Sequence, residues 1–331
     1  MLRDEDMDHQ EISRQFIIEG LVLTIIGAIG ILGNIGAVAR FGKAKYRQHR
    51  FYLLMLTLAI VDILLIISFV WFFSVPAFSG ENRHTYRWSI WLYPMLHIFS
   101  TGNVLLTVAI SLDRYLAICK PLSYHSSPCT TIRTLVPIAF VSIGYNIPRF
   151  FELEWLVFSE KRNGSVINFE FGAWPTELQM DKNYSEIYGL WLNIIILGVV
   201  PMLVLIGLNI SIFKEMRRFK QYVLGGDKHD ERWRATQLKL AKINFIIIII
   251  FIFCHLIKHI LSAHELYFRY NLGINVRKWP HKQTRYIISE ISHVMIVSNS
   301  CVNFYVYLFK KYLNANINYI QGIDELNLEI K

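Results

Sequence analysis

Charged residues are scarce in this chain. They make up 18% of its 331 residues, whereas hydrophobic residues make up 53%. An ordinary soluble domain carries about 25% charged residues, so the composition argues against a soluble protein. The scarcity of charge indicates instead a chain embedded in a membrane, whose core of roughly 30 Å needs about 20 apolar residues per helix.

Cysteine is scarce as well. The four cysteines are Cys119, Cys129, Cys254 and Cys301. In the topology described below, the first two lie at or below the cytoplasmic face and the other two lie within helices. We therefore expect no structural disulfide on the extracellular side.

Catalytic and phosphate-binding motifs are lacking. Ser, His and Asp residues are scattered without a nucleophile motif, and no Gly-rich phosphate loop is present. His264-Glu265 matches the start of a zinc-protease HExxH motif, but Phe268 stands where the second histidine is required. The sequence thus predicts that the chain is not an enzyme and binds no cofactor.

Seven apolar runs dominate what is present. They are residues 21–39, 51–75, 88–112, 132–148, 187–213, 243–268 and 286–309. The pattern predicts an all-α membrane protein, a seven-transmembrane helix bundle forming one domain over residues 1–331, with lipid as its surroundings. A transporter would show inverted repeats or broken helices, and seven runs do not divide into halves.

The distribution of Lys and Arg predicts the orientation. The loops on one side carry 20 of the 34 basic residues and those on the other side carry 13. The positive-inside rule places the more basic side in the cytoplasm, so residues 1–16 are expected to be extracellular and residues 310–331 cytoplasmic. No cleavable signal peptide is seen, and the first run is expected to act as a signal-anchor in the plasma membrane. The +9 charge then reflects topology and not nucleic-acid binding.

Two glycosylation acceptors fall in one predicted extracellular loop. They are Asn163, in Asn163-Gly-Ser165, and Asn183, in Asn183-Tyr-Ser185. Their placement agrees with the predicted orientation.

Asp62 is an ionisable residue in the middle of an apolar run. Such residues are costly in a membrane and usually functional, although neighbouring helices can also simply satisfy a buried carboxylate. Other runs offer amide and hydroxyl groups at a similar depth: Asn34, Asn103, Asn299, Ser300 and Asn303. Carboxylate and amide oxygens are the ligands that a small hard cation or ordered water would take.

Asp113-Arg114-Tyr115 ends the third run at the predicted cytoplasmic border. The carboxylate can hold the guanidinium until another partner competes for it. If the tripeptide stood alone, the preferred interpretation would be an ordinary pair of charged residues snorkelling at a helix end.

Together, motifs from about residue 33 to residue 312 resemble the rhodopsin-like (class A) G-protein-coupled receptors. They occur in order, one set per predicted helix: Gly33-Asn34, Leu58-Ala59-x-x-Asp62, Asp113-Arg114-Tyr115, Pro148, Pro201, Phe251-x-x-Cys254 and Asn303-Phe-x-x-Tyr307. Within that class the chain is most similar to the invertebrate FMRFamide-type neuropeptide receptors. This narrower resemblance depends on Tyr93-Pro94, on residues 100–104, on residues 145–152 and on residues 299–304.

The resemblance implies a receptor that passes an extracellular peptide signal to heterotrimeric G proteins. It implies G-protein coupling through Asp113, Arg114, Tyr115 and Tyr307, and a sodium ion at Asp62. The alternative function is a seven-helix transporter or a non-signalling membrane protein.

The chain also departs from the family pattern. Ser89 stands where most members carry a disulfide-bonded cysteine, His255 replaces a tryptophan and Ile257 replaces a proline. Gln237 stands near the place of an acidic partner for Arg114, and Val297 stands at the place of a retinal-binding lysine. These changes disfavour an opsin and predict a less tightly locked inactive state.

The ligand candidates lie near the predicted extracellular ends of the helices. A peptide ending in Arg-Phe-amide needs an acid for its Arg, and the candidates for ligand contact are Glu152, Glu154, His255, Lys258, Glu265 and Glu290. Each acid can instead be a solvated charge at the rim, and Lys258 can pair with Glu290. After residue 309, Lys310, Lys311 and Tyr312 beside Leu313, Ile317 and Ile320 predict a short amphipathic helix, in a tail without Ser or Thr.

Overall fold

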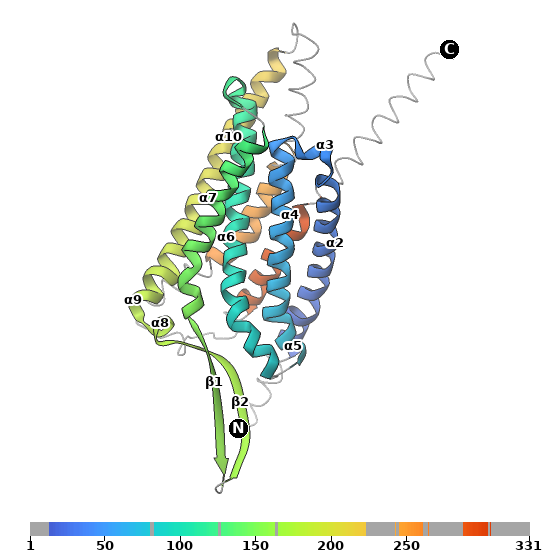
Figure 1. Ribbon diagram of the computed structural model, residues 1–331. Coiled ribbons are helices and arrows are strands. Elements are labelled where there is room, and N and C mark those ends of the chain that lie inside the picture. The colour runs from blue at the N-terminus through green and yellow to red at the C-terminus, as the bar shows by residue number, and fades with distance from the viewer. Residues whose placement is uncertain are drawn as a thin grey trace, which may run out of the picture.

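The computed structural model describes most of the chain. The described residues are 13–79, 83–124, 127–162, 165–222, 242, 245–260, 264, 287–303 and 305. Within these ranges only the backbone is described for residues 79, 83–87, 89, 156–162, 165–173 and 219–222. The described part is an elongated bundle of helices, from one end of which a β-hairpin projects (Figure 1). We call this the hairpin end, and the opposite end, where helix α3 lies, the α3 end.

The spanning helices follow the predicted order. The first consists of η1 (Phe16–Val22) and α2 (Leu23–Phe41), the second of α4 (Arg50–Phe69), η2 (Val70–Ser74) and α5 (Val75–Ser79), the third of α6 (Arg83–Cys119), the fourth of α7 (Pro128–Asn146) and the fifth of η5 (Ser185–Val199) and α10 (Val200–Tyr222). The sixth is Phe245–Ile260 and the seventh covers residues 287–303. The short elements between them are α3 (Ala44–Arg47), η3 (Pro121–Ser123), η4 (Ile147–Phe151), α8 (Glu177–Met180) and α9 (Lys182–Tyr184).

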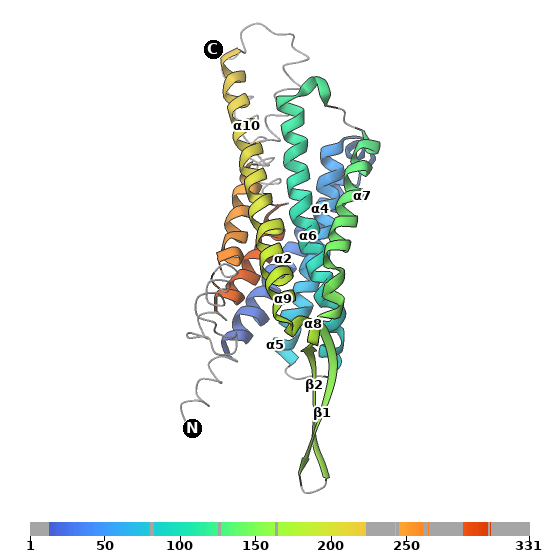
Figure 2. The ribbon, with the colours of Figure 1, turned by 90° about the vertical axis from the view of Figure 1, so that its left-hand side faces the viewer.

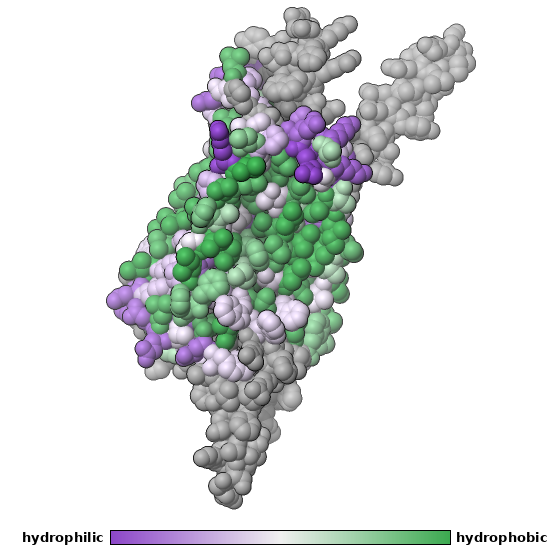
Figure 3. All heavy atoms as spheres, in the orientation of Figure 1, coloured by the Kyte–Doolittle hydropathy of each residue, from purple (hydrophilic) through white to green (hydrophobic). Residues whose placement is uncertain are grey.

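Helix lengths and surfaces agree with a membrane location. Four described helices are long and apolar enough to cross a bilayer: Ser13–Phe41, Arg50–Phe78, Ile90–Cys119 and Lys182–Arg218. Large apolar side chains such as Leu32, Phe140 and Leu203 are more than 60% exposed. On the face shown in Figure 3, apolar residues form a continuous belt around the middle, with hydrophilic residues towards the α3 end and around α8 and α9. This is the distribution that lipid contact requires.

The helix boundaries differ slightly from the apolar runs. Helical structure is already present at Ser13, within the segment 1–16 that we assigned to the extracellular N-terminus. The fourth helix begins at Pro128, four residues before the predicted run, because Ser127 caps it: the Ser127 hydroxyl accepts from the Thr130 N–H at 3.2 Å. Hydropathy marks the lipid-facing length of a helix, so it misses polar turns at its ends.

Helix α6 lies at the centre of the bundle and packs against α4, α7 and α10 (Figures 1 and 2). Three apolar clusters fill the interior between the described helices. Of the two largest, one contains Leu54, Leu58, Leu106 and Ile247, and the other contains Leu65, Ile66, Ile296 and Val297. Many polar residues are buried among these helices as well, and some of them form the sites described below.

Glycines allow the first helix to approach its neighbours closely. A Cβ atom at Gly27 would lie 2.8 Å from Val70 Cγ2, and one at Gly33 would lie 2.7 Å from the Tyr305 ring. Both distances are shorter than carbon atoms tolerate. Small residues in membrane helices commonly allow helices to pack this closely.

The hairpin was not predicted. Strand β1 (Leu153–Arg162) pairs antiparallel with β2 (Ser165–Pro175), from Leu153 opposite Pro175 to Arg162 opposite Ser165, with an irregularity between Glu160 and Lys161. It follows α7 and η4 directly and leads into α8 and α9, so it connects the fourth helix to the fifth. The predicted amphipathic helix after the seventh helix lies outside the described residues.

Candidate functional site

Asp62 joins three helices in the interior of the bundle. Its side chain is fully buried in α4. Asn103 of α6 donates to Asp62 Oδ1 at 2.6 Å, and Asn303 of the seventh helix donates to Asp62 Oδ2 at 2.9 Å. The structure therefore places three members of the predicted polar cluster in direct contact, although their sequence separations reach 241 residues.

The remaining members of that cluster link the first helix to the seventh. The Asn34 side chain donates to the backbone oxygen of Ser300 at 2.9 Å. The Ser300 hydroxyl lies near Asp62. Asn299 Oδ1 is a buried oxygen without a hydrogen-bond partner among the described residues. Five of the six predicted residues are thus connected across four helices, and Asn299 is buried on the seventh helix without a described contact to them.

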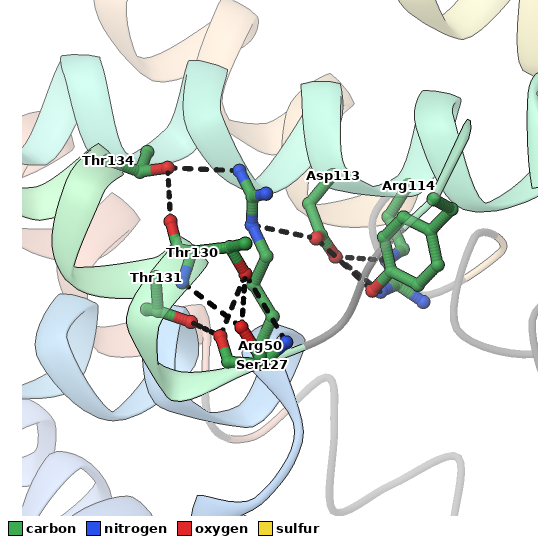
Figure 4. A network of polar contacts seen from close by, with 8 residues as sticks. Arg50, Asp113, Arg114, Ser127, Thr130, Thr131 and Thr134 are labelled. Carbon is green, nitrogen blue, oxygen red and sulfur yellow. Dashed lines mark hydrogen bonds and ion pairs between the residues drawn. The ribbon is translucent and has the colours of Figure 1, made fainter.

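Asp113 is shared between two arginines near the α3 end (Figure 4). It forms an ion pair with the adjacent Arg114, and Arg50 of α4 places its Nε 3.2 Å from Asp113 Oδ1. Tyr124 also donates to Asp113 Oδ1, at 3.3 Å. Asp113 and Arg114 are 0% and 1% exposed, so both charges are held inside the protein. Buried charges are stable only when paired in this way.

The Asp113 cluster extends to the fourth helix. Arg50 Nη2 donates to the Thr134 hydroxyl at 3.0 Å, and the Arg114 guanidinium lies 4.2 Å from the centre of the Phe51 ring. Tyr115 is half-buried. The sequence analysis did not find Arg50, since it lies 63 residues before Asp113 and counted only as a basic loop residue. Tyr307 lies outside the described residues.

Glu152 is the centre of a second charged cluster, at the hairpin end. Arg149 Nη1 lies 3.0 Å from Glu152 Oε2, Tyr93 of α6 donates to the same oxygen at 2.8 Å, and Tyr184 of α9 donates to Oε1 at 2.7 Å. The Arg149 guanidinium also lies over the Tyr188 ring, 4.9 Å from its centre. Glu152 is 1% exposed.

Glu152 is therefore not the solvated rim charge that one of the two interpretations allowed. Both of its carboxylate oxygens are bound by neighbouring side chains, and it is shut off from solvent. The spacing of Arg149 and Glu152, three residues apart, was a usable signal for the pair. Glu154, the other candidate in this segment, is exposed.

Glu290 does not pair with Lys258. Its carboxylate instead binds Arg14 of the first helix, with Nε–Oε2 at 3.0 Å. A second contact between the same two helices joins Glu19 Oε1 to His293 Nδ1 at 2.9 Å. The alternative pairing with Lys258 was wrong because residues 1–16 were treated as an extracellular tail, whereas Arg14 is part of the first helix.

His255 and Lys258 line a cavity of about 20 Å³ together with His259. The other lining residues are Ser100 and Val104 of α6 and Asn193 and Leu197 of η5. The sequence analysis named His255 and Lys258 and missed His259, although histidines four residues apart lie on one helix face. Of the remaining candidates, Asn183 is exposed on α9, and Glu265 and Asn163 lie outside the described residues.

All four cysteines are unpaired. Cys254 and Cys301 are buried, Cys129 is exposed and Cys119 is half-buried. No disulfide therefore supports the hairpin end, in agreement with their positions in the sequence.

Comparison with known proteins identifies the family. The model of the 7 transmembrane receptor (rhodopsin family) matches residues 33–307. An FMRFamide receptor of Drosophila melanogaster is 26% identical over 306 residues, covering 89% of this chain and 52% of the relative. A probable G-protein coupled receptor, frpr-1, of Caenorhabditis elegans is 24% identical and covers 88% and 75% of the two chains. Galanin receptor 2b of Danio rerio is 25% identical and covers 88% and 71%.

The chain spans about half the length of the first of these relatives. The matched region begins at Gly33, within the first helix. It contains the Asp62 and Asp113 clusters, the rest of the first helix and the six spanning helices that follow. Since the family consists of receptors, the prediction that the chain is not an enzyme is confirmed and a transporter is disfavoured. The chain belongs to the rhodopsin family of seven-transmembrane receptors and is a multi-pass membrane protein.

Proposed function

We propose that this receptor binds an extracellular peptide and activates heterotrimeric G proteins. Support comes from relatives in three animals, of which one is named an FMRFamide receptor and another a galanin receptor. One observation carries the proposal that the chain couples to a G protein: the buried Asp113 carboxylate binds two arginines, Arg50 and Arg114. It holds Arg114 inside the bundle in a state from which the guanidinium can be released.

In this proposal the α3 end faces the cytoplasm and the hairpin end faces outwards. Basic residues gather at the α3 end: Arg40, Lys43, Lys45 and Arg47. The sequon residue Asn183 is exposed at the hairpin end. Residues 310–331 then form a cytoplasmic tail of a single domain in the plasma membrane, and Asn163 and Asn183 are the glycosylation sites.

Activation would proceed by a shift between two populations. A ligand that prefers the open state draws the equilibrium towards it, in proportion to its difference in affinity for the two states. Arg114 leaves Asp113 in that state and, with Tyr115 and Tyr307, contacts the G protein. Because Asp113 also binds Arg50 and Tyr124, its charge stays compensated when Arg114 leaves.

Asp62 would link the ligand side to the cytoplasmic side. Its two oxygens hold α6 and the seventh helix directly, so a relative shift of these helices must break or rearrange two hydrogen bonds. The cluster also fits a sodium ion, since it offers the Asp62 carboxylate, the unpartnered Asn299 Oδ1 and the Ser300 hydroxyl, all oxygen donors. A bound sodium ion would stabilise the inactive arrangement by neutralising the carboxylate.

A reporter assay tests the coupling proposal. Cells that express the full chain with a promiscuous G protein are exposed to amidated peptides that end in Arg-Phe, among them Phe-Met-Arg-Phe-amide. We expect a saturable response that disappears in Arg114→Ala at equal surface expression. Responses that persist in Arg114→Ala, or ligand-driven solute flux in place of GTP exchange, would contradict it.

A second variant tests the Asp62 link. In Asp62→Asn, agonist-driven signalling should fall about tenfold or more while surface expression is retained, because the charge that joins the helices is removed. Sodium should also cease to lower agonist affinity. Unchanged signalling together with unchanged sodium sensitivity would rule out the proposed role.

A further inference from the structure

The small cavity between α6, η5 and the sixth helix is lined by basic side chains. Three of its seven described lining residues are His255, Lys258 and His259, and none of the seven is Asp or Glu. We call it the basic cavity. At about 20 Å³ it accommodates one group of the size of a water molecule.

Two imidazole nitrogens at the basic cavity have no partner. The Nε2 atoms of His255 and His259 are buried and make no hydrogen bond in the described part of the chain. His255 is 3% exposed. Leaving a buried polar group unsatisfied costs about 1–3 kcal/mol, so two such atoms beside one cavity indicate a place where a ligand supplies the missing partner.

Packing fixes the direction in which both rings point. The His255 ring stacks on Phe251, with 4.2 Å between the ring centres. The His259 ring lies on the backbone of Gly198, so close that a Cβ atom at this position would be 2.6 Å from His259 Nδ1. The rings are thus held in place without the ligand, and binding needs little reordering of the site.

The chemistry of these groups selects the ligand atom. A lysine ammonium only donates hydrogen bonds, and a neutral imidazole donates through the one ring nitrogen that carries a proton, which we assign to Nε2 in His255 and His259. A guanidinium also only donates and carries a positive charge, so Lys258 repels it. An oxygen of a carbonyl or carboxylate accepts hydrogen bonds and carries negative charge, which suits all three side chains.

We infer that the basic cavity binds a carbonyl or carboxylate oxygen of the ligand, and that the positive groups of the ligand lie elsewhere. The inference specifies the ligand chemistry within the proposed peptide-receptor function. It agrees with the other candidate acids: Glu152 and Glu290 are already paired with Arg149 and Arg14. The described residues around the basic cavity can therefore donate hydrogen bonds to an oxygen atom of the ligand. They include no unpaired carboxylate that could bind a positive group of the ligand.

Three peptide probes test the inference in cells that express the full chain. They are Phe-Met-Arg-Phe-amide, the same peptide as the free acid, and an analogue ending in phenethylamide, which lacks the terminal carbonyl and keeps the Arg and the ring. We expect the analogue to bind about tenfold or more weakly than the better of the other two, as loss of a partner for buried donors implies. Whether the amide or the acid binds better identifies the source of the oxygen.

Variants separate the cavity from general effects. His255→Phe and His259→Phe should reduce the best probe to the affinity of the analogue, and Gly198→Ala should do the same by displacing the His259 ring. His264→Phe, at an exposed histidine five residues after His259, should leave the difference between probes unchanged. Equal discrimination in His259→Phe, Gly198→Ala and the unaltered receptor, all at matched surface expression, would overturn the inference.

A measurement on the purified full chain is independent of peptide signalling. Thermal unfolding is followed with phenylacetamide, phenylacetate or phenethylguanidine. The two oxygen-bearing compounds should raise the Tm in the unaltered chain and not in His255→Phe or His259→Phe. If they do so while no peptide activates the receptor, the proposed function fails and the inference holds. If peptides activate but neither oxygen compound stabilises, or the guanidine stabilises equally, the inference fails alone.

Discussion

Asp113 and Glu152 are buried carboxylates at opposite ends of the bundle. They have similar binding partners but differ in the net charge of the residues around them. Asp113 and Glu152 are both at most 1% exposed, and each binds an arginine close in sequence together with at least one tyrosine. Glu152 is matched by a single arginine, Arg149, and two tyrosines, so its cluster is neutral. Among the described residues Asp113 is matched by Arg50 and Arg114, so this part of the cluster carries an excess positive charge.

The difference indicates what each cluster does. Removing any partner from the neutral Glu152 cluster leaves a buried charge or donor unpaired, which favours a single arrangement. In the Asp113 cluster two guanidiniums compete for one carboxylate, and one can leave while the other compensates it. We therefore expect the Glu152 cluster to be a fixed support and the Asp113 cluster to be a switch.

The largest expected effect is on stability, at the Glu152 cluster. Glu152→Leu should lower the free energy of unfolding by about 3–5 kcal/mol, because Arg149 is left buried and unpaired. Thermal unfolding of the detergent-solubilised receptor measures this. The double variant Arg149→Met/Glu152→Leu should recover much of the loss, and Glu154→Leu, at an exposed acid, should have little effect. A double variant as unstable as the single one would mean that the pair is not the support.

The next effect is on basal signalling, at the Asp113 cluster. Asp113→Asn removes the charge that holds Arg114, so basal GTP exchange should rise about 5- to 30-fold, which corresponds to 1–2 kcal/mol. The measurement is nucleotide exchange without agonist, normalised to receptor number. A loss of ligand binding instead of a gain in activity would show that Asp113 supports folding, as Glu152 does.

A smaller change of opposite sign is expected from the competing arginine. In Arg50→Met the Asp113 carboxylate binds only Arg114 and Tyr124 among the described residues, so the inactive state that holds Arg114 is stabilised. Basal GTP exchange should therefore fall about threefold, within the usual range for one charged contact. Arg47→Met, which removes an equal charge from the exposed helix α3, is the matched control. A rise in basal exchange would show that Arg50 restrains Arg114 and does not compete with it.

The smallest effect concerns reduction of disulfides. Since the described support at the hairpin end consists of hydrogen bonds and ion pairs, a membrane-impermeant reductant should change the affinity of the receptor for its agonist less than about twofold, within ordinary context effects. Agonist binding to intact cells before and after treatment measures this. A steep loss of affinity would reveal a disulfide with a partner chain.

The sequence predicted the Asp62 and Asp113 clusters more fully than the Glu152 cluster, for a physical reason. Burying a charge in an apolar run costs free energy, so charged residues in such runs are rare. Asp62 and the adjacent pair Asp113 and Arg114 could therefore be recognised from the sequence. Tyr93, Tyr184 and Arg50 look like ordinary residues at helix ends. Their contacts with Glu152 or Asp113 depend on how separate helices are rotated and tilted against each other, which local patterns do not contain.

The hairpin was overlooked although the sequence carried a signal. Asn163-Gly164 stands between two runs rich in aromatic and β-branched residues, and Asn-Gly in this setting is a strong hairpin signal. The dipeptide was interpreted as part of a glycosylation acceptor. Likewise, the alternative pairing of Glu290 with Lys258 was wrong because acidic and basic residues near the start of the chain were assigned to the extracellular segment before the first helix.

The contacts between the first and seventh helices have a consequence for biosynthesis. Asn34 binds Ser300, Cys301 Sγ donates to Ile26 O at 3.2 Å and Tyr305 donates to Ile29 O at 3.0 Å. The contacting residues are 266 to 276 positions apart. The first helix enters the membrane early in translation, yet its buried polar face finds these partners only after nearly the whole chain has been made. Until then the Asn34 amide has only the Gly30 oxygen of its own helix, at 2.9 Å, so the ring of helices closes last and truncated chains should be recognised as unfinished.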